Sequence, residues 1–489
     1  MMSLTNFTYA FFANLAILMV AVGLILRPPV QRKWWVALNP AWWINLGAAG
    51  GWVYLILQAP TDAGVFGPSA AVSRILMVLA ITNILFLFYN GGQTLGALQR
   101  AVLANFLLGA NLWWLGAQNI ILALLALALI AIGTYFLLLL GSKALQMRFL
   151  WRFFVVDQVA NIFILVALVI LAKLGLGLQV PTAFSTLPLP ENPLTVPLVT
   201  ISVIFLLTAL IFKLGPLPFS GWWIDLVANF KAEAILAFIM LGMLPVAYGL
   251  LRFIWVLLPT SYLALGQIPD LFYVFTGIMM AIYNWWAWKN RDFASSCMQG
   301  LLALAAMFLI FVPLSLTANV ESELSVYMIY YILVVSGVLT ILPSFKNKKT
   351  KATLPPMHPL QGLFYKNFAQ AVLVVVLWAA VMGLPLTFGL PIKYILHMSV
   401  LRQGHLGGMI CLLVGALATA AFWGHHLTYL FQEKSPDEAT AEDHAVLAPL
   451  SLAPPALWRT RLFWLGFGLV VVLMGLGIYP SLLMAYFRG

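Results

Sequence analysis

The stretch that decides the fold runs from Ile204 to Phe253 and reads IFLLTALIFKLGPLPFSGWWIDLVANFKAEAILAFIMLGMLPVAYGLLRF. An apolar run reaches one cation, Lys213, and restarts after an interruption into a second long apolar run. The residues that interrupt it are Gly215, Pro216 and Pro218. Irregular backbone at membrane depth is tolerated only inside protein or beside water, and a lone ammonium there marks function by default. The other interpretation is an ordinary turn between two helices, with Lys213 extending to the surface.

The composition is that of a membrane protein. Of 489 residues, 63% are hydrophobic and 8% are charged, and the mean hydropathy is +1.01, far outside the averages of soluble domains. The formal net charge of +11 does not indicate nucleic-acid binding, because the basic residues form no clustered face with aromatic side chains. Cys297 and Cys411 lie in separate apolar segments, so we expect two small buried residues and no zinc, haem or iron–sulfur site.

Apolar runs long enough to cross a bilayer recur along the chain. At about 20 residues per span they predict about fourteen transmembrane helices, and therefore an all-α polytopic membrane protein. The first run, 11–26, is followed rather than preceded by positive charge, so we expect a retained helix and not a signal peptide. The other predicted spans are 41–58, 71–90, 101–116, 119–140, 153–175, 195–224, 232–258, 270–288, 295–316, 325–343, 366–398, 406–431 and 462–486.

Basic loops alternate with loops that contain few cations. The basic residues in every second loop are Arg27, Arg32, Lys33, Arg100, Lys143, Arg148, Arg152, Lys289, Arg291, Lys346, Lys348, Lys349 and Lys351. The positive-inside rule then predicts that both termini face away from the cytoplasm. Two loops are long: the basic loop 347–357, and the loop 432–461 with its acidic run EKSPDEATAEDH. Such an acidic run predicts a solvated loop or, alternatively, a docking site for a soluble partner.

A second interrupted helix lies at Trp378 to Met398, WAAVMGLPLTFGLPIKYILHM, with Lys393 near its end. The residues expected to break this helix are Gly383, Pro385, Gly389 and Pro391. Each half of the chain therefore combines helix breakers with one intramembrane lysine. Matched interruptions in the two halves of a membrane protein indicate an ion pathway.

At these residues the chain resembles the antiporter-like membrane subunits of respiratory complex I (subunits L, M and N) and the Mrp-type cation/proton antiporters. In that family a lysine of the seventh helix is followed by P-F-H-x-W-L-P-D. The matching residues here are Pro218, Phe219, Trp222 and Asp225, and Ser220 replaces the histidine. Further similar motifs are Tyr248 to Arg252, Lys289 with Ser295 and Ser296, Gly383 to Pro385 followed by Lys393, and Ile478 to Pro480. The similarity extends from about residue 100 to the C-terminus.

The resemblance implies two inverted five-helix repeats, each with a broken helix, the seventh and the twelfth. We therefore expect helices one to three in 1–98, the first repeat in 99–258, the second repeat in 259–431, and a cytoplasmic loop with helix fourteen in 432–489. It also implies a proton-translocating subunit of a complex-I-like NADH:quinone oxidoreductase or a related assembly. The expected surroundings are other membrane-arm subunits and the lipid of a bacterial inner membrane.

The chain departs from the family at three positions. The glutamate of the fifth helix falls on Ala128, the lysine of the eighth helix falls on Leu244, and the histidine is Ser220. In the family the glutamate and the lysine of the seventh helix form a pair whose separation modulates proton affinity, and the eighth helix passes the proton toward the twelfth. We therefore expect the first half-channel to be altered or impaired.

Asp157 is the nearest candidate for the missing acid. A buried lysine titrates usefully only if a neighbour offsets its desolvation, and a carboxylate does so. The alternative partners for Asp157 are Arg152 and Arg148 at the membrane surface. Asp225 is expected at the mouth of a helix rather than in mid-membrane.

Histidines extend the second candidate pathway. His397 follows Lys393 by one helical turn and His405 lies on the next segment, so the three side chains could relay protons. The alternative for a lone histidine at a helix end is an interfacial position. His425 and His426 are expected near the cytoplasmic end of their helix, where they could serve the exit.

The sequence contains no catalytic centre that we can identify. It has no Gly-rich phosphate loop in a βαβ context, no metal-ligand cluster and no nucleophile elbow, so we expect no cofactor in this chain. Any NADH or quinone chemistry would belong to partner subunits. The transported ion is expected to be a proton, because a protonated lysine cannot coordinate a metal cation. Two alternatives are a membrane subunit that partners a soluble cytoplasmic enzyme in inorganic-carbon uptake, and a structural paralogue that no longer pumps.

Overall fold

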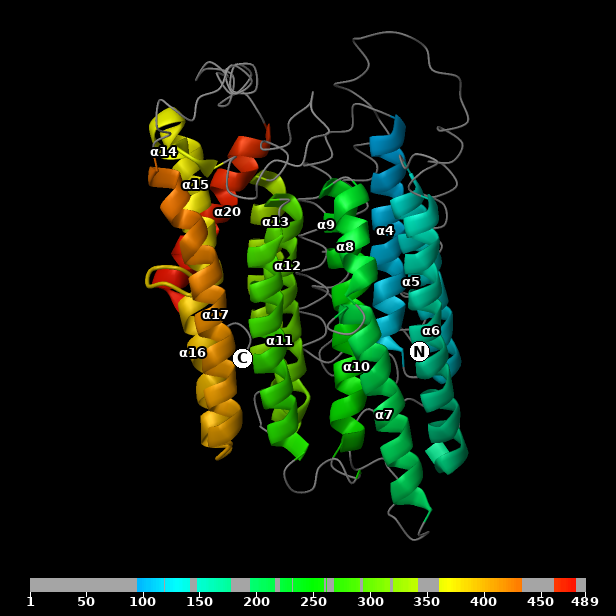
Figure 1. Ribbon diagram of the computed structural model, residues 1–489. Helices are drawn as coiled ribbons and strands as arrows, with labels where there is room; N and C mark the ends of the chain where they lie inside the picture. Colours follow the sequence, from blue (N-terminus) through cyan, green and yellow to red (C-terminus); the bar gives the residue numbers. More distant parts are fainter. Residues whose placement is uncertain are drawn as a thin grey trace. The chain divides into compact units, whose positions relative to one another are not determined.

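The computed structural model is helical throughout the residues that it describes, with no strand among them (Figure 1). These residues are 95–117, 119–140, 147–176, 194–215, 220–230, 232–258, 261, 268–290, 293–316, 320–341, 360–432 and 461–480. The predicted helices 11–26, 41–58 and 71–90, both long loops, and Pro216 and Pro218 lie outside them. The chain divides into two compact units, residues 1–268 with 315–321 and residues 269–314 with 322–489.

Six described helices are long and apolar enough to cross a membrane, so the polytopic α-helical class is confirmed. Four of these helices lie in the first unit, and Leu406–Phe431 lies in the second. The sixth helix, Val320–Ile341, has its first two residues in the first unit and the rest in the second. The six are Ile120–Leu139, Met147–Leu174, Thr195–Leu214, Ala234–Leu257, Val320–Ile341 and Leu406–Phe431. The count of fourteen helices and the sidedness of the termini stay predictions.

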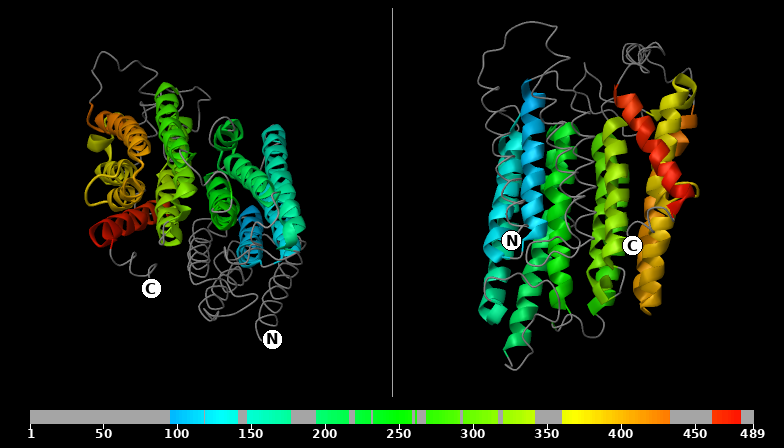
Figure 2. Two further views of the ribbon diagram at one scale, coloured as in Figure 1. Left: turned by 90° about the horizontal axis from the view of Figure 1, so that it is seen from below. Right: turned by 180° about the vertical axis from the view of Figure 1, so that it is seen from behind.

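The first unit packs its helices around one long central helix. Its elements are α4 (Leu95–Gly116), α5 (Ile120–Leu139), α6 (Met147–Leu171), the π-helical turn η3 (Ala172–Leu176), α7 (Thr195–Leu214), α8 (Gly221–Asn229), α9 (Ala232–Phe238), the π-helical turn η5 (Ile239–Met243) and α10 (Leu244–Leu257). The apolar stretch of α9, η5 and α10 is 100% buried, whereas that of α6 is 33% buried. The central helix therefore meets protein on all sides, and α6 presents most of its surface outward (Figure 2).

Two side chains of α4 donate to carbonyls of the central helix, and a proline explains one of these bonds. Pro245 has no N–H, so the Leu241 carbonyl lacks its usual donor four residues later. The Asn111 amide donates to that carbonyl at 2.6 Å, and the Trp114 indole N–H donates to the Pro245 carbonyl at 3.1 Å. Both bonds are buried and join residues 130 or more positions apart. The irregular turn η5 is thus stabilised inside protein, where its polar groups find partners.

The second unit contains a helix that is broken in its middle. Its elements are α11 (Ile268–Lys289), α12 (Phe293–Ala306) with the 3₁₀ turns η8 (Met307–Phe311) and η9 (Pro313–Leu316), α13 (Val320–Ile341), α14 (Leu363–Lys366), α15 (Phe368–Met382), α16 (Gly389–Arg402), α17 (Leu406–Phe431) and α20 (Arg461–Ile478). In Figure 1 α15 lies above α16, and the segment between them stands out from the side.

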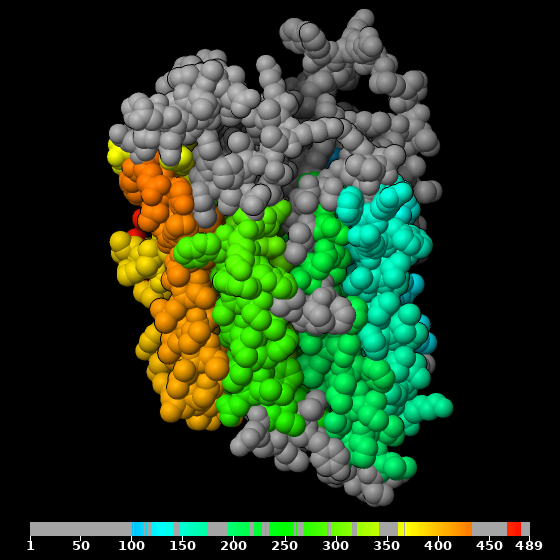
Figure 3. Space-filling model, viewed as in Figure 1, coloured from blue at the N-terminus to red at the C-terminus, as the bar shows by residue number. Residues whose placement is uncertain are grey.

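Small residues allow α11 and α17 to approach closely. A Cβ atom on Gly277 would overlap the backbone carbonyl of Cys411, and one on Gly415 would lie 2.8 Å from the Gly277 oxygen. The Asn284 amide donates to the Thr419 hydroxyl across the same contact at 2.9 Å. Close backbone packing and such interhelical hydrogen bonds hold membrane helices together where the solvent is apolar. The opposite face of α17, orange in Figure 3, exposes large apolar side chains: Leu406, Ile410, Leu413, Val414 and Leu417.

The break between α15 and α16 begins at Gly383, as the sequence predicts, and it ends before Gly389, which is earlier than the sequence predicts. Gly383 ends α15 with φ of +82°, and residues 384–388 are not helical. Gly389 and Pro391, predicted as breakers, instead lie in the first turn of α16. Proline is tolerated there because the first N–H groups of a helix have no intrahelical partner. Gly389 instead allows α16 to pack closely against α15, because a Cβ atom there would overlap the Ala380 carbonyl.

Helix α20 packs against the segment between α15 and α16. The Phe388 N–H donates to the Leu473 carbonyl at 3.0 Å, although the two residues lie 85 positions apart. A Cβ atom on Gly477 would overlap the backbone of Thr387, so α20 can approach only because this residue is glycine. Leu386, within the break, adopts φ of +69°, which side chains rarely adopt. The non-helical backbone is therefore held by tertiary contacts.

Gly389→Ala tests this close packing. The added methyl group would push α16 away from Ala380, and overpacking of this kind costs about 1–3 kcal/mol. We expect the apparent Tm of the detergent-solubilised full-length chain to fall by several degrees. Gly407→Ala is the matched control, because nothing lies within 4 Å of a Cβ atom there. Equal Tm values for the two variants would contradict the close approach.

Candidate functional site

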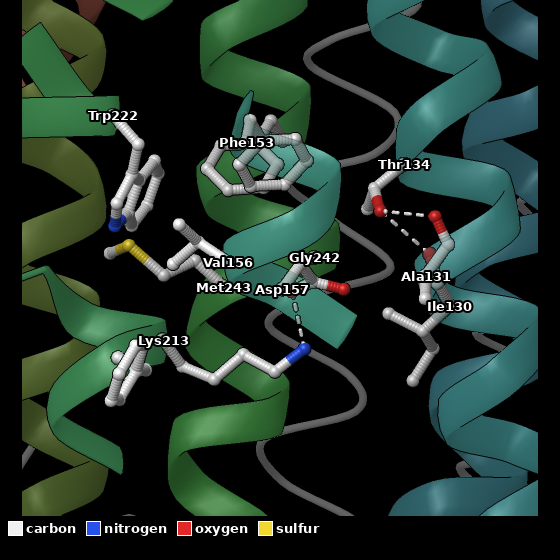
Figure 4. Close-up of a pocket in the computed structure, with 12 residues that line it drawn as sticks. Ile130, Ala131, Thr134, Phe153, Val156, Asp157, Lys213, Trp222, Gly242 and Met243 are labelled. Carbon is white, nitrogen blue, oxygen red and sulfur yellow. Dashed lines mark hydrogen bonds and ion pairs between the residues drawn. The ribbon is translucent and has the colours of Figure 1, made fainter. Parts of the chain in front are cut away.

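Lys213 and Asp157 form a buried ion pair in the first unit (Figure 4). Lys213 lies in the last turn of α7 and Asp157 lies on α6. Lys213 Nζ is 2.5 Å from Asp157 Oδ1, and the two side chains are 7% and 9% exposed. The second carboxylate oxygen lies 3.5 Å from the Asn161 amide nitrogen. Lys213 therefore does not extend to the surface, and its charge is balanced by a carboxylate.

The pair lies at a small cavity with apolar walls. The cavity leaves about 10 Å³ for the centre of a water molecule, which is near the minimum for holding one. Aromatic rings form one wall: the centroids of Phe153 and Phe238 are 5.0 Å apart, and those of Phe153 and Trp222 are 5.3 Å apart. Thr134 also lines the cavity, but its hydroxyl donates to carbonyls of its own helix. Water can reach this pair only in very small amounts in this conformation.

The helix end beside Lys213 depends on glycine. Gly215 ends α7 in the left-handed region, with φ of +74°, and its N–H donates to the Ile211 carbonyl at 3.0 Å. A Cβ atom there would lie 3.1 Å from the Trp222 ring. Helix α7 thus ends one residue after Lys213, and the chain resumes as α8, which lies above α7 in Figure 1. The span 195–224, in which the sequence predicts an interruption after Lys213, therefore contains two helices.

The arginine alternatives for Asp157 are not realised. Arg152 instead lies 3.5 Å from Asp225, with side chains 69% and 31% exposed. Asp225 therefore lies in a much more exposed ion pair than Asp157, and in this structure it is separate from the Lys213 pair. The choice between the two partners could not be made from the sequence, because it depends on the rotation of α6.

The position to which the resemblance assigns the family's glutamate does not face Lys213 in this structure. Ala128 lies on the exposed face of α5, so a carboxylate at that position would point away from Lys213. The residues of α5 that line the cavity are Ile130, Ala131 and Thr134. The difference is one of helical phase, because a shift of two residues rotates a side chain by about 200° around the helix. Leu244, the position of the other missing family residue, is fully buried in the central helix.

In the second unit, Lys393 caps the end of α15. Its ammonium donates to the Val381 carbonyl at 2.6 Å and to the Met382 carbonyl at 3.1 Å. The Tyr330 hydroxyl donates to the Ala380 carbonyl at 3.0 Å. The last carbonyls of a helix lack intrahelical partners and carry its negative dipole, so a cation is favoured there. Lys393 is 6% exposed, and among the described residues its ammonium donates to carbonyls.

Two buried histidines lie on opposite sides of this break. His397 Nδ1 lies 2.6 Å from the Lys393 carbonyl on α16, and His426 Nδ1 lies 2.9 Å from the Phe422 carbonyl on α17. A carbonyl accepts, so each Nδ1 carries a proton and each neutral ring keeps its lone pair on Nε2. Neither Nε2 atom has a hydrogen-bond partner of good geometry among the described residues, although the Leu412 backbone lies close enough to act on His397. His426 packs against Trp378 of α15, with ring centroids 5.4 Å apart.

The other two predicted histidines lie nearer the surface. His405 Nδ1 is 3.0 Å from Asp270 Oδ1, and the His425 ring stacks on Trp288 with centroids 4.4 Å apart. His405 and His425 are separated by 20 residues of α17, or about 30 Å. The structure therefore brings Lys393 and His397 together, and places His405 and the His425–His426 pair toward opposite ends of the unit.

Sequence reasoning missed several polar residues of the second unit. Tyr330, Glu323, Ser399 and Tyr273 make buried or half-buried hydrogen bonds there. A tyrosine or serine in an apolar run is usually a packing residue, and only the partners, 50 or more positions away, reveal these roles. Glu323 could have been singled out from the sequence, because it is an acidic residue at the start of an apolar span.

Comparison with known proteins gives one family and several similar structures. Residues 117–419 match the family described as NADH:quinone oxidoreductase/Mrp antiporter, TM. A chain of respiratory complex I from Thermus thermophilus with bound aureothin is 16% identical, with a TM-score of 0.71, over 96% of this chain and 98% of that chain.

Two further structures have the same fold. A chain of the Mrp complex from Dietzia sp. DQ12-45-1b is 14% identical, with a TM-score of 0.73, over 99% of this chain and 96% of that chain. A chain of the membrane-bound sulfane sulfur reductase, an archaeal respiratory membrane complex, is 12% identical, with a TM-score of 0.76, over 99% of this chain and 95% of that chain. At these identities the likeness concerns the fold alone.

A double-mutant comparison tests the buried ion pair. Removing one partner of a buried pair leaves an uncompensated charge and costs about 3–5 kcal/mol, whereas removing both is far less costly. We expect Asp157→Asn and Lys213→Met each to lower the apparent Tm of the solubilised full-length chain. The double variant should lie closer to the parent than either single variant. Additive losses in the double variant would show that the two groups do not interact.

Proposed function

Because this chain belongs to the NADH:quinone oxidoreductase/Mrp antiporter family, we propose that it conducts protons as one membrane subunit of a multisubunit assembly. The observation that carries the proposal is a buried lysine beside a helix break in each of the two units. Buried ionisable groups are rare in membrane helices and are expected to serve transport. Conduction requires that these groups gain and lose protons while the helices around them keep their polar backbone satisfied.

In the first unit, Lys213 and Asp157 form the switchable pair. The carboxylate acts strongly on the ammonium only at close range, so separating the two changes how tightly the lysine holds its proton. The helix end at Gly215 and the π-helical turn η5 are both irregular elements near the cavity, which Gly242 and Met243 line. Irregular turns of this kind recur at functional sites in helices. Asp157 thus takes the role that the resemblance assigned to the fifth helix.

Proton transfer from the Lys213–Asp157 pair to the central helix is the step for which the first unit lacks a carrier. From Ala234 to Leu251 the central helix has no lysine, histidine, aspartate or glutamate, and Leu244 is fully buried. A proton that leaves Lys213 toward the central helix would meet an apolar wall. The first half-channel is therefore impaired because a following proton carrier is missing, and not because an acid is missing.

The second unit has the better-supplied path. Lys393 is followed after one turn by His397, whose buried Nε2 atom has a lone pair available for a proton. His426, on the other side of the break, offers the same kind of nitrogen. An imidazole can accept a proton on one nitrogen and release it from the other, which suits a relay. We assign the main proton path of this chain to the second unit.

The partners follow from the same proposal. The similar chains come from multisubunit membrane complexes, and we propose that this chain assembles with other membrane-arm subunits in a bacterial inner membrane. Any reaction that drives proton movement would take place in those partners. The exposed apolar faces of α5, α6 and α17 suit either lipid or neighbouring membrane helices.

Proton uptake by liposomes tests the proposal. The assembly would be purified through a tag on the full-length chain and reconstituted with a trapped pH dye, and a valinomycin potassium potential would drive uptake. We expect Lys393→Met to lower the uptake rate about tenfold or more, because a proton carrier is lost. Lys213→Met should give a smaller decrease. Lys289→Met is the control, because Lys289 lies exposed over the Trp285 ring at the end of α11.

Lys393→Gln separates transport from folding. Its amide can still donate to a carbonyl of α15 but cannot carry a proton at neutral pH. We expect this variant to assemble as the parent does and still to lose uptake. Equal, small effects of the Lys393 and Lys213 variants would refute the relay. Uptake by the parent no faster than that of protein-free liposomes would refute proton conduction.

A further inference from the structure

Beyond His397, the end of α16 gathers polar groups from three helices of the second unit. The Ser399 hydroxyl donates to Glu323 Oε1 of α13 at 2.9 Å. The Tyr273 hydroxyl of α11 donates to Gln403 Oε1 at 2.6 Å. His405, just after α16, pairs with Asp270 of α11, as described above. Three helices thus place polar side chains at one end of the unit.

The solvent exposure of these side chains increases from the buried part of α16 toward its end. Ser399 is 8% exposed and Tyr273 is fully buried, whereas His405 and Asp270 are 22% and 40% exposed. Glu323 is half-buried and lies within electrostatic range of Tyr273, as does Asp270. The Tyr273 and His405 rings are in contact, with centroids 5.4 Å apart. The cluster therefore connects the buried part of α16 with the surface of the unit.

The two acids of this cluster contact groups that can share or exchange a proton. Glu323 accepts a hydrogen bond from the Ser399 hydroxyl, and Asp270 pairs with His405, which is charged only when protonated. Carboxylates, imidazoles and phenols are the side chains that exchange protons with water. A carboxylate within a membrane-spanning bundle is rare and is by default a candidate for function.

We propose that Glu323 and the Asp270–His405 pair are the groups through which the Lys393 path exchanges protons with water at the end of α16. Ser399 and Gln403 act as positioning residues that orient the Glu323 carboxylate and the Tyr273 hydroxyl. Each step moves one proton from a donor oxygen or nitrogen to an acceptor, and no bond between heavy atoms changes. The inference rests on the proton conduction proposed above and adds the place where protons enter or leave.

The same liposome assay tests it with a matched pair of acids. Glu323 and Glu321 both lie in the first turn of α13, and Glu321 pairs with Arg252 at 3.6 Å in a half-buried contact. We expect Glu323→Gln to lower the uptake rate several-fold and Glu323→Asp to restore most of it, because the aspartate keeps an exchangeable carboxyl. Glu321→Gln should transport as the parent does. Asp270→Asn should lower the rate, and Asp270→Glu should restore it.

The outcomes separate this inference from the proposed function. If Lys393→Gln stops uptake and both Glu323→Gln and Asp270→Asn match the parent, the second unit conducts but exchanges protons elsewhere. If Glu323→Gln lowers uptake and Glu323→Asp does not restore it, Glu323 is a structural residue and the inference fails. If Lys393→Gln, Glu323→Gln and Asp270→Asn all match the parent, both proposals fail together.

Discussion

Every backbone carbonyl that a helix break frees inside an apolar bundle must find a donor, and this requirement shapes both units. In the first unit, Asn111 donates to the Leu241 carbonyl of the irregular turn η5, whose usual donor is missing at Pro245. In the second unit, Tyr330 and Lys393 supply the donors at the end of α15. The penalty for an unpaired group in hydrocarbon is several kcal/mol, so these side chains are as necessary to the fold as the apolar contacts. The charged groups are positioned by the same requirement.

The two buried lysines solve the problem of a charge in an apolar setting in different ways. Lys213 is balanced by a full negative charge on Asp157, in a cavity that is almost dry. Lys393 is held by the partial charges at a helix end and has a histidine one turn away. The first arrangement favours a closed pair that opens only with movement of α6 or α7. The second keeps its proton next to an available base, and this difference supports assigning the main path to the second unit.

Much of this architecture could be predicted from the sequence, and the failures have physical reasons. Apolar runs predicted α5, α11 and α17 to within a few residues, because length and hydropathy directly reflect the bilayer. Gly383 was predictable as a helix end, since glycine adopts positive φ at little cost. Helical phase was not predictable: the sequence did not show that Ala128 faces away from Lys213, and it left the partner of Asp157 undecided. The Glu323 cluster was missed because its members are joined only by tertiary contacts across α11, α13 and α16.

The double duty of Lys393 has an evolutionary consequence. A lineage that gave up transport would lose little by replacing His397, whose Nε2 atom has no partner among the described residues. Replacing Lys393 would leave two peptide oxygens bare at once, so selection for folding alone would preserve it. In homologues that have lost transport, we therefore expect His397 to be substituted first and Lys393 to be retained for folding.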